Sequence, residues 1–317
     1  MKLNAIALAL GLASASAFAG NVITIDPDGL GSDAAIQVST LGWNNGNSIS
    51  VDGVNAVNTG GLIQTYGQAG LANFNDASSN VITGTGLNAA YQWTYVFGVQ
   101  EQAVPTGPTA SDFFATNGGD NFFKVYYNAA KTQNNLNGTG FTDGQLILSG
   151  TISAYDPTSG FGYSNFAITS PTTPKLDQNG TNNYAGLTTT VGSGSSLFEG
   201  IVQIGFIDTN FFKGSISEII IALDSFNSTP FKHVDPSSCF TDGAGNLIGG
   251  AGQNSTGTAP VACTNTIGAV NGVSGPNIMF ETRATNDFVT TTVPEPGSMA
   301  LVGAGLLSAL GLSRKRR

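Results

Sequence analysis

Short apolar runs separated by turn-forming residues follow one another along most of the chain. Asp26-Pro27-Asp28-Gly29 ends the first run, and Asp143-Gly144 is a strong turn signal just before a long one. We expect strands at residues 22–25, 36–41, 47–51, 61–66, 90–99, 122–127, 145–155, 200–208, 215–223 and 277–282. This spacing predicts an all-β body, an antiparallel β-sandwich or a jelly roll. A β-solenoid would require a short fixed repeat, and we find none.

The run at residues 90–99 has the clearest alternation. Tyr91, Trp93, Tyr95 and Phe97 fall on one face of the expected strand. Such a face either packs in the core of a sheet or lies exposed as a platform on which sugars stack. We favour the core, because four aromatic side chains form a broad apolar surface.

The remaining segments are expected to have little regular structure. They are residues 104–121, 169–196 and 235–275, and a Thr-rich stalk at 287–293. Residues 210–214 are expected to join the runs on either side as a hairpin. We find no internal boundary that divides the body.

Composition supports this fold class. Glycine is abundant (43 residues), charged residues make up 10% of the chain, and windows rich in helix-forming residues are missing almost everywhere. The 40% hydrophobic content with 19 Phe is ample for a packed core, so a disordered chain is not expected.

The N-terminus has the features of a secretory signal peptide. Met1-Lys2 supplies an early positive charge, residues 5–15 are apolar, and Ala17-Phe18-Ala19 is a small-x-small cleavage site. We expect residues 1–19 to be removed and Gly20 to be the first mature residue.

The C-terminus has three parts. Pro294-Glu295-Pro296 is followed by an apolar run of Gly, Ala, Leu and Ser, and then by Arg314, Lys315, Arg316 and Arg317. The apolar run predicts a short helix, below the ~20 residues that cross a bilayer in one span. The basic end should stay on the cytoplasmic side. The pattern indicates transient anchoring in the inner membrane, followed by processing.

This tail resembles the PEP-CTERM sorting signal, named for the motif that is here Pro294-Glu295-Pro296. The resemblance implies recognition and cleavage near the motif by an exosortase, a membrane-embedded Cys-dependent enzyme. It also implies delivery to the cell surface or the extracellular matrix of a Gram-negative bacterium. The predicted organisation is therefore a signal peptide (1–19), an all-β extracellular body (20–292) and a sorting signal (293–317).

Charge separates the body from its two ends. Five of the 11 cationic residues lie in the ends, so between Gly20 and Pro296 six cationic residues face 20 acidic residues, and the net charge of that stretch is 6 − 20 = −14. An acidic body disfavours nucleic acid and anionic lipid as partners. Divalent cations or neutral glycans suit it better.

Two cysteines, Cys239 and Cys263, enclose a segment rich in Gly, Asn, Ser and Thr. In an oxidising compartment we expect them to form one disulfide, contributing about 3 kcal/mol at most. A zinc site would need further ligands.

Recognisable catalytic motifs are missing from the sequence. His233 is the only histidine, there is no Gly-x-Ser-x-Gly elbow, and we expect this histidine to be solvated or structural. Asp26, Asp28 and Asp33 have the alternation of a calcium loop, but a turn explains them more simply, so calcium is only a weak candidate and no other cofactor is expected. We therefore expect the protein not to be an enzyme.

Diffuse features of the body resemble the flocculation-associated PEP-CTERM proteins. They are the early Asp-Pro-Asp-Gly turn, the Phe-rich run at residues 122–127 and the glycine-rich turn at residues 138–144. The resemblance implies non-catalytic adhesion or flocculation through exopolysaccharide or other matrix components. Two alternatives stay open: a secreted glycan hydrolase or lyase with unmarked carboxylates, and a calcium-stabilised structural layer protein.

Overall fold

Strands make up nearly all of the regular structure. A computed structural model describes residues 22–31, 35–154, 163–169, 174–214, 216, 218–226, 231–249, 268–272 and 275–289. The elements are β1 (Ile23–Ile25), β2 (Ile36–Val38), β3 (Thr40–Trp43), β4 (Gly46–Val51), α2 (Gly53–Thr59), β5 (Gly61–Asn75), β6 (Gln92–Gly107), β7 (Ala110–Ala115), β8 (Phe122–Asn128), β9 (Gln145–Ala154), β10 (Tyr163–Thr169), β11 (Val191–Ile207), β12 (Glu218–Phe226), β13 (Cys239–Thr241), β14 (Leu247–Gly249), β15 (Gly268–Val270) and β16 (Asn277–Val289). The predicted all-β class is confirmed.

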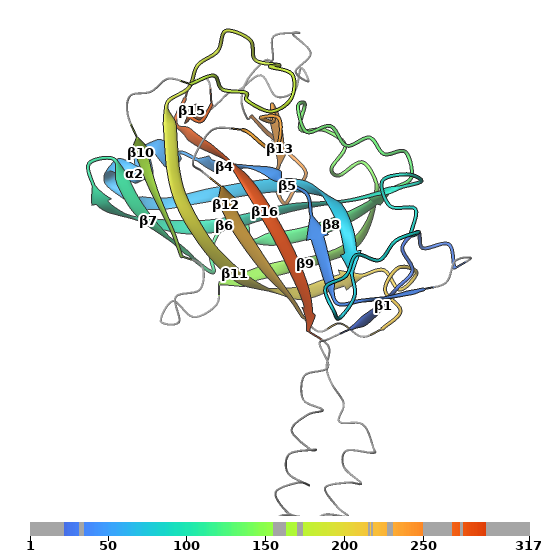
Figure 1. Ribbon diagram of the computed structural model, residues 1–317. Helices are drawn as coiled ribbons and strands as arrows, with labels where there is room; N and C mark the ends of the chain where they lie inside the picture. Colours follow the sequence, from blue (N-terminus) through green and yellow to red (C-terminus); the bar gives the residue numbers. More distant parts are fainter. Residues whose placement is uncertain are drawn as a thin grey trace, which may run out of the picture.

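The main sheet closes on itself (Figure 1). β5, β6, β11 and β16 are its longest strands, with 13 to 17 residues each; β12 lies between β11 and β16, and shorter strands fill the remaining places end to end. β3 and β4 lie between β16 and β5, β8 and β7 pair with successive parts of β6, and β10 and β9 pair with successive parts of β11. Because β8 also pairs with β9 and β7 with β10, the series of hydrogen-bonded strands returns to the strand from which it starts. The two layers expected of a sandwich are thus opposite walls of one continuous, mostly antiparallel sheet.

The aromatic face of β6 fills the inside of this sheet. Trp93 and Tyr95 are fully buried, and each makes an edge-to-face contact, Trp93 with Phe74 at 5.2 Å between ring centroids and Tyr95 with Trp43 at 4.7 Å. Such contacts add about 0.5–1.5 kcal/mol each to the burial of the rings. The prediction that this face belongs to the core is confirmed, so these rings are not a surface for sugar stacking.

Each end of the closed sheet is plugged by a different element. At one end Phe211 and Phe212 lie 5.9 and 5.7 Å from Trp93, ring centroid to centroid, and Asp26 N donates to Phe211 O next to β1. At the other end α2 buries Ala56 and Val57 against β5, β6 and β7. The sequence did not predict this helix, because Gly, Asn and Thr are weak helix formers and packing alone holds so short a segment.

The outer face of β4, β5, β6 and β8 is buried as well. Three segments outside the main sheet, 129–144, 174–190 and 231–249, cover it and form an outer layer. The apolar residues of this second cluster come from the strands and from the outer layer together: Ile49, Tyr66, Val96, Phe122, Phe141, Leu176, Tyr184, Phe231, Val234, Phe240 and Met279. Close approach of the layer explains Gly138, where φ is +69° and an added Cβ would lie 1.9 Å from Cys239 O.

Buried amide side chains tie the outer layer to the sheet. Asn47 donates to Asp235 O at 3.0 Å and accepts from Ser237 N at 3.2 Å. Gln68, directly opposite it in the sheet, donates to Cys239 O at 2.9 Å. Thr94 on β6 donates to Phe141 O at 2.6 Å. These bonds satisfy loop carbonyls that would otherwise be buried without a partner.

Several segments expected to be irregular contain strands. β7 lies within residues 104–121, β11 begins inside 169–196, and β13, β14 and β15 lie within 235–275. β16 continues to Val289, where the stalk was expected to have begun. The hairpin predicted around residues 210–214 is confirmed by the pairing of β11 with β12.

The amide anchoring leads to a stability prediction. Asn47→Ala should lower the free energy of unfolding by about 2 kcal/mol, because Ser237 N and Asp235 O lose their partner in a buried site. Asn44→Ala, at an exposed position three residues earlier, should change it by less than about 0.5 kcal/mol. Urea denaturation of both variants tests this, and equal effects would contradict an anchoring role for Asn47.

Candidate functional site

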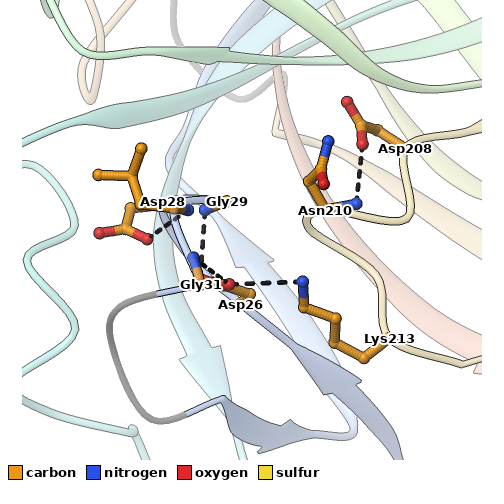
Figure 2. Close-up of polar contacts among 8 residues, drawn as sticks. Asp26, Asp28, Gly29, Gly31, Asp208, Asn210 and Lys213 are labelled. Atoms are coloured by element: carbon orange, nitrogen blue, oxygen red, sulfur yellow. Dashed lines mark hydrogen bonds and ion pairs between the residues drawn. The ribbon is translucent and has the colours of Figure 1, made fainter.

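The first predicted site is the Asp26 turn (Figure 2). Asp26 is buried, and its carboxylate accepts from Gly29 N at 3.2 Å and from Gly31 N at 2.9 Å. Lys213 Nζ lies 3.5 Å from Asp26 Oδ2, so the negative charge already has a cationic partner. Asp28 accepts from Leu30 N at 3.0 Å within the same turn. These bonds fit the turn interpretation.

The geometry gives calcium no support at this turn. Asp33, the third suggested ligand, lies outside the described residues. Within the described ranges, no group of three or more His, Cys, Asp or Glu side chains is arranged to hold a metal ion.

A pair of carboxylates that the sequence did not indicate lies in the outer layer. Asp177 accepts from Asn179 N at 3.0 Å and from Asn183 N at 2.9 Å. The side-chain amides of Asn179 and Asn183 both donate to Asp235 Oδ1, at 3.3 and 3.2 Å. The two acids are 58 residues apart in sequence, so the sequence does not indicate that they are neighbours. The spacing of Asp177 and Asn179 indicates only a local turn.

The environment of Asp177 favours its protonated form. Burial raises the pKa of the Asp177 carboxyl, and the nearby charge of Asp235 acts in the same direction, while the two backbone N–H bonds oppose it. A carboxyl group whose pKa is raised beside a second carboxyl group is one requirement of acid–base chemistry.

His233 lies beside this pair as an anchor of the outer layer. Glu281, buried on β16, accepts from His233 N at 2.6 Å and from Val234 N at 3.2 Å, and its other oxygen lies 3.1 Å from His233 Nδ1. The imidazole is 55% exposed. This geometry agrees with the expected structural role of the histidine.

Glu101 is a titratable group on the inward-facing side of β6, between the aromatic core and the α2 plug. Thr65 Oγ1 donates to Glu101 Oε2 at 2.6 Å, and Ser50 Oγ lies 2.8 Å from Thr65 Oγ1. Burial raises the pKa of Glu101 to about 7, although the bond from Thr65 opposes the rise.

The remaining predicted residues fall outside the described part of the chain. They are the cleavage-site residues Ala17, Ala19 and Gly20, the motif Pro294, Glu295 and Pro296, the basic residues Arg314, Lys315, Arg316 and Arg317, and Cys263. Cys239 is buried at the start of β13, and its disulfide with Cys263 stays a prediction. Among the described residues there is no helix with the length and apolar character to cross a bilayer.

Comparison with known proteins identifies the C-terminus. Residues 292–317 match the family model of the PEP-CTERM protein-sorting motif. The expected resemblance is thereby confirmed: the chain carries a PEP-CTERM sorting motif, which implies an exported, membrane-sorted protein that is processed at the cell envelope by an exosortase. No curated protein and no solved structure matches the chain.

The position of Glu101 predicts a pH-dependent stability. Because its pKa is raised from about 4.5 to about 7 in the folded state, the unfolded chain releases the proton first as pH rises. Stability should therefore be complete below pH 4.5, fall between pH 4.5 and 7, and stay lower above pH 7.

The variant Glu101→Gln tests this assignment. It keeps an acceptor for Thr65 but cannot ionise, so it should be more stable than the unaltered protein by about 1–3 kcal/mol at pH 8 and about equal to it at pH 4. Denaturant unfolding at the two pH values measures the difference. A difference that does not change with pH would show that Glu101 is not the group responsible.

Proposed function

We propose that this exosortase substrate acts, once processed, as a non-catalytic protein of the cell surface or extracellular matrix, in exopolysaccharide-associated adhesion or flocculation. The observation that carries the proposal is the sorting motif at residues 292–317, joined to an acidic, compact, all-β body. The resemblance of this signal to PEP-CTERM tails implies delivery of the body to the cell surface or the extracellular matrix, and the proposal builds on that implication.

The use of carboxylates within the body supports a non-catalytic role. Asp26 closes a turn, Asp242 accepts from Ala244 N and Asn246 N at 2.9 and 2.7 Å, and Glu281 holds the segment at His233. Each of these acids is bonded to backbone N–H groups of its own neighbourhood. Such acids maintain loop geometry and are poorly placed to exchange protons with a substrate.

The kind of binding follows from the surface and from the buried rings. Since Trp93 and Tyr95 fill the core, stacking of sugars on the aromatic face of β6 does not contribute. The net charge of −14 between the ends favours neutral glycans, or acidic glycans bridged by divalent cations. Hydrogen bonds from uncharged polar side chains would then give weak, repeated contacts.

Deletion and binding experiments test the adhesion role. A strain lacking the protein should flocculate less, and the purified body, residues 20–292, should bind the producer's own exopolysaccharide more tightly than unrelated dextran. Normal flocculation of the deletion strain together with absence of binding would refute the proposal. Intact-mass analysis of the secreted protein, compared with a Pro294→Ala, Glu295→Ala double variant, shows separately whether the tail is processed.

A glycan hydrolase or lyase is the second candidate, because Asn179 and Asn183 bond both acids and the pKa of Asp177 is raised. Their backbone N–H groups donate to Asp177, and their side-chain amides donate to Asp235. This candidate predicts release of new sugar ends from exopolysaccharide by the purified body. Asp177→Asn and Asp235→Asn should each abolish the release while binding persists. Lack of any release by the unaltered body would eliminate this candidate.

A further inference from the structure

The folded body ends very close to the sorting motif. β16 runs to Val289, whose neighbour across the sheet is Glu218, and Pro294 follows after only four residues. A chain of that length spans at most about 18 Å from Val289 to Pro294, even when fully extended. Whatever holds the motif must therefore lie near the end of the sheet at which β16 leaves.

The surface at this exit is built by three neighbouring parts of the chain. Thr40 Oγ1 on β3 donates to Asp287 Oδ1 at 2.8 Å, and β1 lies nearby through its pairing with β2, which leads into β3. The segment 208–214 pairs with β1, with Lys213 N donating to Thr24 O at 2.9 Å. We call this surface the exit end; Figure 1 shows it where β16 and β1 come together.

The opposite end of the sheet cannot reach the motif. α2 is bonded to the start of β16, where Val54 N donates to Pro276 O at 2.8 Å and Asp52 N donates to Asn277 Oδ1 at 2.9 Å. The thirteen residues of β16 extend over about 40 Å. With a connection of at most about 18 Å, the start of β16 stays at least about 20 Å from Pro294.

We propose that the exit end is the face that the body presents to the membrane-embedded exosortase, and that the α2 end points away from it. The inference rests on the sorting part of the proposed function and is independent of the adhesion role. On this proposal, the processing enzyme contacts one end of the folded body as well as the linear motif.

The charge of the exit end favours contact with the enzyme over contact with the lipid surface. Lys213 at the exit end is paired with Asp26, while Asp28, Asp208, Glu218 and Asp287 add negative charge there. An anionic lipid surface repels such an end, whereas a neutral or basic protein surface does not. A partner protein that grips the motif therefore fits this end better than headgroups do.

Photo-crosslinking in cells tests the orientation. p-Benzoylphenylalanine is placed in the full chain at Thr209 of the exit end, or at Thr106, another exposed threonine, at the end of β6 next to the α2 plug. With a tagged exosortase co-expressed, we expect the probe at position 209 to form an adduct with the enzyme. We expect the probe at position 106 to form none. Equal adducts from both positions, an adduct from 106 alone, or a lipid adduct from 209 in place of the enzyme would overturn the proposal.

A spacer variant and a cleavage assay complete the test. Inserting about 20 Gly and Ser residues after Val289 should abolish the preference for position 209, because the body can then move freely relative to the motif. Persistence of the preference with the spacer would show that the short connection does not set the orientation. Cleavage is followed in the same cells: if the unmodified chain is not cut near Pro294, the sorting assignment itself fails, whereas cutting without an adduct from 209 overturns only the orientation.

Discussion

The packing of Trp93 inside the closed sheet is the interaction on which the rest of the structure depends. Its ring is fully buried, touches Phe74 from β5 and the plugging residues Phe211 and Phe212, and its Nε1 donates to Pro27 O at 2.9 Å. One side chain thus joins the wall of the sheet, the plug at the exit end and the N-terminal turn. A closed sheet must fill its interior with side chains, and a chain rich in Gly, Asn, Ser and Thr does so with a small number of large rings.

A second layer of the molecule follows from the same constraint. One face of β6 points into the interior of the sheet, and its other face carries Gln92, Thr94 and Val96. All three of these residues are buried beneath the outer layer. Strands that are covered on both faces lose the simple alternation between apolar and polar residues. The polar residues of the outer face are consequently not solvated but serve as anchors for loop backbone.

These features explain which parts of the fold and of the candidate site could be predicted from the sequence. The strands around residues 90–99, 145–155 and 200–223 were predictable, because their apolar runs and turn residues are local signals. Closure of the sheet was not, since it depends on pairings such as that of β16 with β3 and β4, more than 200 residues apart in sequence. The pair Asp177 and Asp235 was missed for the same reason. α2 was missed because its seven residues, GVNAVNT, form a helix only through the contacts they make.

Closure of the sheet also limits how copies of the protein can associate. An open sheet exposes a row of backbone N–H and C=O groups along each outermost strand, and copies of such a protein can join through them into aggregates. Along the described strands β5, β6, β11, β12 and β16, both flanks are occupied by neighbours within the same molecule. Along these strands, contacts between copies of the protein are thereby left to side chains, and such contacts are weaker, reversible and open to adjustment by substitution.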